Sequence, residues 1–169
     1  MPKSFTFSEA KKSDKKDILK FYKRHGYSAK FMGFDTCYFI EANDEIIASV
    51  ILSNLVEAQA KVKAKAKAEA IQSTPENENS SLAHAPLFLH ALYVVQDYRK
   101  LGLGRQLMAH AIERHHYIIC FAEQALTPFY QALRFQPVKY DALPVIFSDR
   151  YRLYADQQPS LVSFEYRAS

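Results

Sequence analysis

Residues 94–105 read Val-Val-Gln-Asp-Tyr-Arg-Lys-Leu-Gly-Leu-Gly-Arg, and this stretch decides the expected fold. It follows an almost continuous apolar run, Leu87 to Val95, of the kind that forms a strand inside a sheet. Gly102 or Gly104 then opens a helix that should run to about His115. Glycine permits a tight turn whose N–H groups face a ligand, and a helix start adds unbonded N–H groups and a positive dipole end. Such a strand-loop-helix unit favours binding of a pyrophosphate.

The glycine loop by itself is a weak signal. Arg99, Lys100 and Arg105 add positive charge beside it. It is not a P-loop, because no Gly-Lys-Ser/Thr sequence follows, and it lacks the third glycine and the early βαβ position of a dinucleotide-binding fingerprint. An ordinary strand-to-helix turn, with glycines for close packing, explains these residues equally well. The wider sequence decides between the two interpretations.

Two separated motifs resemble those of the GNAT N-acetyltransferases. The pattern Arg-x-x-Gly-x-Gly at residues 99–104, after a buried strand, resembles the family's motif A. The run Leu-Thr-Pro-Phe-Tyr-Gln-Ala-Leu-Arg-Phe at residues 126–135 resembles its motif B, in which Phe-Tyr is usually followed by a Gly-Phe pair. The resemblance covers Leu87 to Val138. It implies an enzyme that moves an acetyl group from acetyl-CoA to a primary amine by direct attack, without a metal.

The fold implied by the resemblance is α/β, with a mixed and mostly antiparallel central sheet that is flanked by helices and splayed at the cofactor strand. The rest of the sequence is compatible with it. Strands are expected at residues 4–8, 36–42, 45–53, 117–122, 135–138 and 161–166, and helices at 14–25, 127–133 and 143–154. Ser13 and Thr127 are expected to cap two of these helices, with Pro128 at the first helical position.

Residues 57–71 read Glu-Ala-Gln-Ala-Lys-Val-Lys-Ala-Lys-Ala-Lys-Ala-Glu-Ala-Ile and give conflicting signals. Their strict alternation is typical of a strand, but Ala, Lys and Glu favour a helix. A helix would spread the lysines around its surface and leave no coherent core face, so we expect a weakly packed helix or an extended hairpin arm. Residues 72–85 predict a mobile loop. We expect a single N-acetyltransferase domain over residues 1–169, with a mobile insertion at 57–85.

The resemblance also implies how acetyl-CoA binds. The backbone of Leu92 and Val94 would pair with the pantetheine arm, as an added strand would. The N–H groups of residues 100–105 would hold the pyrophosphate, with Arg99 beside it. The expected cofactor-binding residues are therefore Leu92, Val94, Arg99, Lys100, Leu101, Gly102, Leu103, Gly104 and Arg105.

Tyr130 is the first catalytic candidate. The thiolate that leaves the thioester is expelled more readily if an acid protonates it. A thiol has a pKa of about 8.5 and a tyrosine about 10, so Tyr130 can stay protonated and donate. The resemblance to motif B implies this role. A core tyrosine packed beside Phe129 is the alternative.

His90 and Glu123 are the candidates for the base that takes a proton from the amine. By period two, His90 is expected on the same strand face as Leu92 and Val94, and an imidazole titrates near neutrality. Some relatives, such as arylalkylamine acetyltransferases, carry a histidine at this strand position. A buried histidine bonded to backbone is an equal alternative. Glu123 ends the next strand, near the expected splay.

Arg134 departs from the family pattern, because it stands where a glycine usually precedes Phe135. A glycine there would supply a left-handed helix cap. The helix of motif B must therefore end differently, or Arg134 must bear some strain. A tilt of Tyr130 would be one consequence.

The composition indicates a globular chain with one core. Its 169 residues are 49% hydrophobic, which suffices for one core and not comfortably for two. The net charge of +4 is interpreted as ordinary surface charge, although a mild excess also attracts anionic ligands. Cys37 and Cys120 lie in apolar runs, which favours buried thiols in a reduced compartment over a disulfide. No signal-peptide core and no apolar run near the ~18 residues of a membrane span are seen, so a cytoplasmic location is expected.

Three functional hypotheses stay open. The first is an N-acetyltransferase of a small-molecule or peptide amine, with neither nucleic acid nor membrane as partner. The second is a toxin-like enzyme that acetylates aminoacyl-tRNA, whose mark would be a coherent basic face around the cleft. The third is a non-catalytic acyl-CoA-binding sensor or scaffold. Homodimers through the last strands are common in the family, so a homodimer is one expected state.

Overall fold

The computed structural model describes residues 4–69 and 85–169, and their strands form one seven-stranded sheet of order β1-β2-β3-β4-β5-β7-β6. The strands are β1 (Thr6–Glu9), β2 (Thr36–Ala42), β3 (Glu45–Ser53), β4 (Leu87–Val94), β5 (Tyr117–Glu123), β6 (Gln136–Pro137) and β7 (Leu161–Arg167). Only β4 and β5 run parallel among the described strand pairs. The mixed, mostly antiparallel sheet predicted from the sequence is confirmed.

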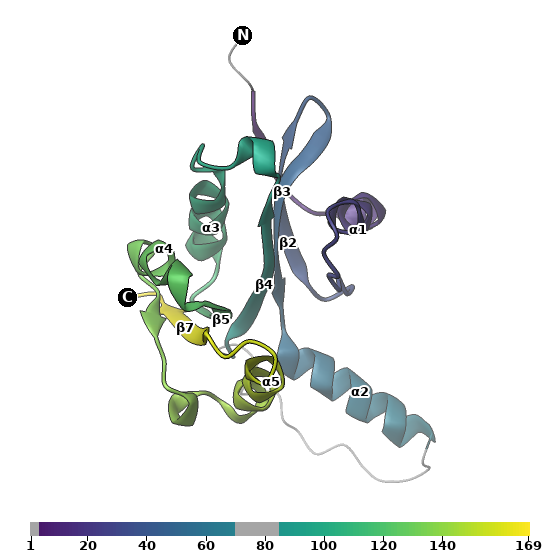
Figure 1. Cartoon of the computed structure of the whole chain (residues 1–169). Helices are drawn as coiled ribbons and strands as arrows, with labels where there is room; N and C mark the ends of the chain where they lie inside the picture. Colours follow the sequence, from purple (N-terminus) through teal and green to yellow (C-terminus); the bar gives the residue numbers. More distant parts are fainter. Residues whose placement is uncertain (1–3, 70–84) are drawn as a thin grey trace.

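Helices cover both faces of this sheet, and α3 and α1 lie on opposite sides of it (Figure 1). The helices are α1 (Lys15–Arg24), α2 (Leu55–Glu69), α3 (Leu103–Arg114), α4 (Thr127–Ala132) and α5 (Val145–Ala155). In β5, Ile118 and Cys120 join the apolar cluster under α3 and α4, whereas Ile119 joins the cluster under α5. This alternation places α5 on the same face as α1, because successive strand residues point to opposite faces. Below, the two sides are called the α3 face and the α1 face.

The hairpin of β2 and β3 has the predicted bounds, with Asn43 and Asp44 at φ +52° and +64°. Two positive φ values are typical of the type I′ turn, whose twist matches the flanking strands. The two predicted caps were wrong by one residue. The N-cap of α1 is Asp14, which follows a short 3-10 turn, and Thr127 is already helical. The Thr127 hydroxyl instead donates to the Gln124 carbonyl oxygen at 2.7 Å.

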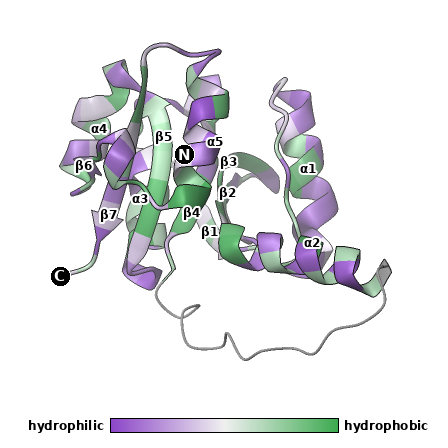
Figure 2. Cartoon of the chain, turned by 90° about the horizontal axis from the view of Figure 1, so that it is seen from below, coloured by the Kyte–Doolittle hydropathy of each residue, from purple (hydrophilic) through white to green (hydrophobic). Residues whose placement is uncertain are grey.

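The first part of the predicted insertion is a helix, α2, and not a hairpin arm. Leu55 in its first turn is buried, but residues 59–68 are all exposed. Figure 1 shows α2 projecting from the end of β3, and Figure 2 shows apolar and polar bands alternating along it. The weakly packed helix that the Lys-Ala alternation suggested is therefore what forms. The predicted mobile loop at 72–85 falls almost wholly outside the described residues.

Both cysteines are buried free thiols, as predicted. Burial raises the pKa of the Cys37 thiol to about 12, and burial likewise raises the pKa of Cys120. Both thiols are therefore protonated and unreactive near neutral pH. Within the two described ranges, every helix is too short or too polar to cross a membrane.

Candidate active site

The sheet splays between β4 and β5. These strands pair at only three positions, from Leu87 with Ile118 to Leu89 with Cys120. β4 nevertheless continues to Val94 along β3, and β5 continues to Glu123 along β7. The facing edges beyond Leu89 and Cys120 are therefore not paired with each other. Such backbone edges can pair with an extended ligand as they would with an added strand.

A β-bulge interrupts β4 at the start of this splay. His90 pairs with Ile51 and Tyr93 with Ser49, so two residues of β4 lie opposite one of β3. Ala91 carries the irregularity, with φ +56°, and its carbonyl oxygen accepts a 2.7 Å hydrogen bond from the buried Tyr22 hydroxyl.

The bulge changes which face His90 occupies. Ala91 packs in the α1 cluster, whereas Leu92 and Val94 pack against the α3 cluster. His90 stacks on Phe88, which belongs to the cluster under α5. The period-two prediction that put His90 on the face of Leu92 and Val94 was therefore wrong, because the extra residue reverses the alternation.

The predicted glycine loop lines a pocket of about 390 Å³ on the α3 face. Seven of the nine predicted cofactor-binding residues line it, together with Tyr98 and Phe129: Val94, Arg99, Lys100, Gly102, Leu103, Gly104 and Arg105. Leu92 and Leu101 do not line it. Leu92 packs against the core and Leu101 is half exposed.

The floor of this pocket is the N-terminus of α3. Gly102 is the N-cap, with φ +77°, and no side chain caps the helix. The first N–H groups of α3, from Leu103 onward, thus lack intrahelical acceptors and suit an anion. A Cβ on Gly102 would come no closer than 3.9 Å to another residue, so backbone conformation and not space requires glycine there.

Arg99 folds back onto the end of β4. Its Nε donates to the Val94 carbonyl oxygen at 2.9 Å, and its guanidinium lies over the Tyr93 ring at 5.5 Å. Arg99 therefore ties the glycine loop to the strand. The same bond already occupies one of the Val94 groups that the resemblance assigns to pantetheine.

Tyr130 lies in α4, buried at 5% exposure. Its ring stacks on Phe164 with centroids 5.0 Å apart and meets Phe135 edge-on. Burial first, and then the nearby Cys120 thiol, raise its pKa well above the ordinary value. Cys120 is the last β5 residue paired with β4, so the Tyr130 hydroxyl lies where the splay begins.

Arg134 takes the left-handed conformation that the family's glycine would take, with φ +67°. The Phe135 N–H donates to the Tyr130 carbonyl oxygen, and the Arg134 N–H to that of Gln131, each at 3.0 Å. These two bonds form a Schellman cap. Of the two alternatives left open by the sequence, the strained arginine is the one that occurs.

His90 lies on the α1 face with one ring nitrogen engaged. Its Nε2 is 2.8 Å from the Ser53 hydroxyl, and its ring stacks on Phe88 at 5.4 Å. Burial first, and then the positive charge of Arg150, lower the pKa of His90 to about 4. The imidazole is therefore neutral at neutral pH and able to accept a proton.

Asp35 lies behind Ser53. Its Oδ2 accepts the Met32 N–H at 2.7 Å, while its buried Oδ1 has no hydrogen-bond partner within the described residues. Burial raises the pKa of this carboxyl above its ordinary value, against the opposing effects of the Met32 N–H, the Ser53 hydroxyl and the charges of Lys15 and Arg150. Asp35 is half buried, and Ser53 lies near both its carboxyl and the His90 imidazole.

Two pockets meet at His90. One, of about 620 Å³, lies between α2, α5 and the segment around Ser28 and Lys30. The other, of about 300 Å³, is lined by Tyr27, Phe88, Phe121 and neighbours at the splay. Ser28, His90 and Tyr154 line both, so the two form one channel that passes the imidazole.

The sequence and the fold can now be compared with known proteins. A family model described as "Acetyltransferase (GNAT) domain" matches residues 34–137. The chain belongs to the GNAT acetyltransferase family. No curated protein sequence matches it.

Solved structures share the GNAT fold at low identity. The Escherichia coli ribosomal-protein-S18-alanine N-acetyltransferase matches with TM-score 0.60 and 13% identity, over 98% of this chain and 95% of its own. Arabidopsis thaliana NAA60 in complex with acetyl-CoA matches with TM-score 0.55 and 13% identity, over 98% of both chains.

A Neisseria gonorrhoeae N-acetylglutamate synthase, complexed with coenzyme A and N-acetyl-glutamate, matches with TM-score 0.60 and 14% identity. The match covers 98% of this chain, which spans about a third (35%) of the synthase. These likenesses show the fold. With the family match, they support an acyl-CoA-dependent N-acyltransferase whose co-substrate is acetyl-CoA.

Within the GNAT fold, the predicted site residues separate into groups. The glycine loop, Tyr130 and His90 all border the splay, from different faces. Glu123 is exposed at the end of β5 and lines none of the pockets described here. Ser53 and Arg150 were missed, because a serine in a strand and an arginine in a helix carry no signal without the fold.

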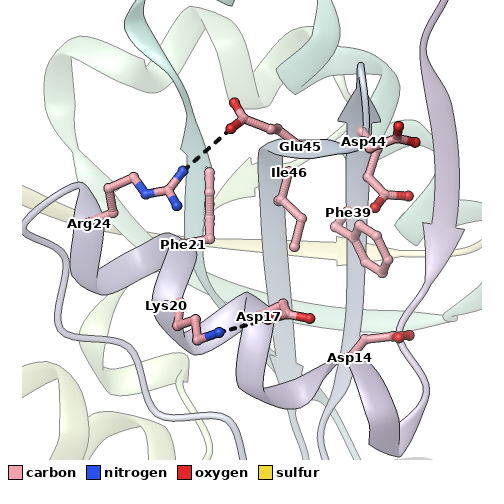
Figure 3. A pocket seen from close by; sticks show the side chains of 10 residues that line it. Asp14, Asp17, Lys20, Phe21, Arg24, Phe39, Asp44, Glu45 and Ile46 are labelled. Carbon is pink, nitrogen blue, oxygen red and sulfur yellow. Dashed lines mark hydrogen bonds and ion pairs between the residues drawn. The ribbon is translucent and has the colours of Figure 1, made fainter.

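A further pocket of this GNAT domain, of about 290 Å³, lies between α1 and the β2–β3 hairpin (Figure 3). Five carboxylates line it, from Asp14, Asp17, Glu41, Asp44 and Glu45. Its cations are already paired, Lys20 with Asp17 at 3.3 Å and Arg24 with Glu45 at 3.9 Å. It shares no lining residue with the pockets at the splay. Across the described residues, no group of three or more His, Cys, Asp or Glu is placed to hold a metal ion.

Proposed function

We propose that this protein transfers an acetyl group from acetyl-CoA to the primary amine of a small molecule or peptide, by direct attack of the amine on the thioester. One observation carries the proposal. The unpaired edges of β4 and β5 lie between an anion-binding helix start on the α3 face and a channel past a neutral histidine on the α1 face. Cofactor and acceptor would thus approach the splay from opposite faces.

Binding of the cofactor would depend mainly on backbone groups. The N–H groups at the start of α3 would hold the pyrophosphate, with Lys100 and Arg105 on the rim of the pocket. The pantetheine arm would extend along β4 toward the splay. Because Arg99 already bonds the Val94 carbonyl oxygen, the arm would either displace that side chain or use the neighbouring groups of the edge.

His90 would act as the base. The amine nitrogen attacks the thioester carbon, the C–N bond forms, the C–S bond breaks, and one amine proton passes to the imidazole. If the Ser53 hydroxyl oxygen accepts from His90 Nε2–H, then Nδ1 is free to accept that proton. Ser53 would then be a positioning residue. Glu123 is the alternative base, and its exposure at the strand end favours it less.

Tyr130 would stabilise the sulfur that leaves the thioester. Its pKa lies far above that of a thiol, so its first contribution is a hydrogen bond to the developing thiolate, which lowers the barrier to C–S cleavage. The sulfur finally carries a proton as free coenzyme A, and the proton that His90 received returns to solvent.

The proposal is tested by measuring release of the coenzyme A thiol from acetyl-CoA with a panel of primary amines. The expected result is amine-dependent release, with an N-acetylated product of the matching mass. The panel includes polyamines, amino acids, arylalkylamines, aminoglycosides and peptide N-termini. Absence of amine-dependent release across the panel, from protein that binds acetyl-CoA, would favour a non-catalytic sensor instead.

A further inference from the structure

The walls of the channel that leads to His90 are unusually apolar and exposed. Eight large apolar side chains are exposed among the described residues, and four of them line this channel: Tyr27, Val62, Leu153 and Tyr154. Val62 and Leu153 are each 69% exposed. Clustering of such side chains in one concavity indicates an apolar ligand group, because isolated exposure would scatter them.

Helix α2 supplies one wall of the channel. Leu55, Ala58 and Val62, at helical spacing, all face the larger pocket, opposite Ile146 and Leu153 of α5. This is the one stripe of α2 that is not dominated by Lys and Ala. The insertion therefore has a place in the acceptor site, which its sequence alone did not reveal.

Arg150 is a cationic residue of the larger pocket whose charge acts on His90. Its guanidinium lies over the Phe88 ring at 5.2 Å, and the same ring stacks on His90. The guanidinium forms none of the ion pairs found among the described residues, and no hydrogen bond of its own there. The charge of Arg150 acts on the Asp35 carboxyl, but the two form no ion pair. A half-buried guanidinium outside any such pair is well suited to a bidentate anion.

The charges around the larger pocket also favour binding of an anionic group beside Arg150. In the lining of the larger pocket Lys30 and Arg150 are cationic, Asp149 is the one anionic residue, and His90 is neutral. Asp35, near Ser53, lies outside this lining, and burial raises the pKa of its carboxyl. Asp149 is exposed, and it precedes Arg150 on the helix, so the two side chains point in different directions. The end of the channel beside the imidazole is therefore positive.

We propose that the acceptor is an amino acid with an apolar side chain, whose α-carboxylate binds Arg150, whose α-amine faces His90, and whose side chain lies between α2 and α5. This inference rests on the proposed function and specifies its substrate class. Arg150 and His90 both line the larger pocket and both contact the Phe88 ring, so the amine and the carboxylate of one small molecule would face the same cavity. A bound carboxylate would also offset the positive charge that lowers the pKa of His90, and would strengthen the base in the loaded site.

The test compares matched acceptors in the thiol-release assay. L-leucine and L-phenylalanine are paired with 3-methylbutylamine and 2-phenylethylamine, which lack only the carboxylate, and putrescine represents diamines. We expect kcat/KM to be about 10- to 100-fold higher for each amino acid than for its paired amine. In Arg150→Gln this preference should vanish. Arg152→Gln should keep it, because Arg152 lies on the same helix as Arg150 but contacts Tyr140, outside the pocket.

The remaining outcomes separate this inference from the proposed function. Equal or faster turnover of the paired amines, or a preference for putrescine, would overturn the amino acid assignment while acetyl transfer itself stands. Failure of every one of these five acceptors, with acetyl-CoA still bound, would overturn it as well. Failure to bind acetyl-CoA at all would contradict the proposed function. Val62→Asp supplies a second check, because a charge on the α2 wall should raise KM for L-leucine and leave acetyl-CoA affinity unchanged.

Discussion

The two faces of the splay are built in different ways. On the α3 face, a run of consecutive residues, 98–105, supplies most of the cofactor pocket, largely through backbone groups. On the α1 face, the acceptor channel is assembled from side chains of segments far apart in the sequence: the stretch around Ser28, α2, β4, β5, α5 and the start of β7. A binding site that is built from the backbone of one segment leaves a recognisable motif in the sequence. A site made of distant side chains does not, and it can change without altering the fold.

The largest expected effect concerns the acceptor side. His90→Gln should lower kcat/KM for the amine by about 10²- to 10³-fold, because the attacking nitrogen loses its proton acceptor. Acetyl-CoA affinity should not change, since the cofactor pocket lies on the other face. His110→Gln in α3 is the matched control. If His90→Gln lost acetyl-CoA affinity and turnover to the same extent, the cofactor site and the acceptor site would not be independent of each other.

The next effect is on acid stability. The pKa of His90 is about 4 in the folded chain and about 6.5 when unfolded. Between these values the unfolded chain binds a proton that the folded chain does not, so stability is complete above pH 6.5 and falls as the pH drops toward 4. The loss attributable to His90 is up to about 3 kcal/mol. Urea unfolding at pH 7 and pH 4.5 should show a smaller pH dependence for His90→Gln than for wild type.

Tyr130→Phe should lower kcat by about 10- to 100-fold, because the leaving sulfur loses a hydrogen-bond donor. The substitution keeps the ring stacked on Phe164, so the fold should survive. Tyr166→Phe, in the same apolar cluster, is the control and should turn over normally. Full turnover by Tyr130→Phe would leave Tyr130 as a core residue only.

The smallest expected effect is on stability and concerns the strained backbone of Arg134. Arg134→Gly should stabilise the protein by about 1 kcal/mol, because glycine adopts φ +67° without the steric cost that arginine bears. Gln131→Gly, inside the same helix, should destabilise it by a similar amount. Thermal unfolding measures both. A destabilised Arg134→Gly would mean that the bond from Arg134 to Ser169 outweighs the backbone strain.

Sequence patterns predicted most of the fold and one half of the site. The alternation in β2 and β3 and the apolar run of β4 fixed those strands closely, because local periodicity and burial coincide there. Arg134 was recognised as a departure because it replaces a glycine whose backbone role is known, and strain was one of the two alternatives that the sequence left open.

Two features could not be predicted in this way. The bulge at Ala91 has no local signal, since alanine at φ +56° is set by tertiary contacts such as the Tyr22 hydrogen bond. The bulge moved His90 to the other face. Arg150 and Ser53 are likewise ordinary residues whose position beside His90 depends on segments far apart in the sequence.

Calorimetric titration of acetyl-CoA tests the central claim most directly, with wild type beside the double variant Gly102→Glu/Gly104→Glu. Circular dichroism would first verify that both proteins fold. The two glutamates place carboxylates at the start of α3, where the pyrophosphate would lie. The account predicts binding to wild type and none to the variant. A folded wild type that does not bind acetyl-CoA, or a variant that binds it equally well, would contradict the assignment of this loop and the acetyl transfer that depends on it.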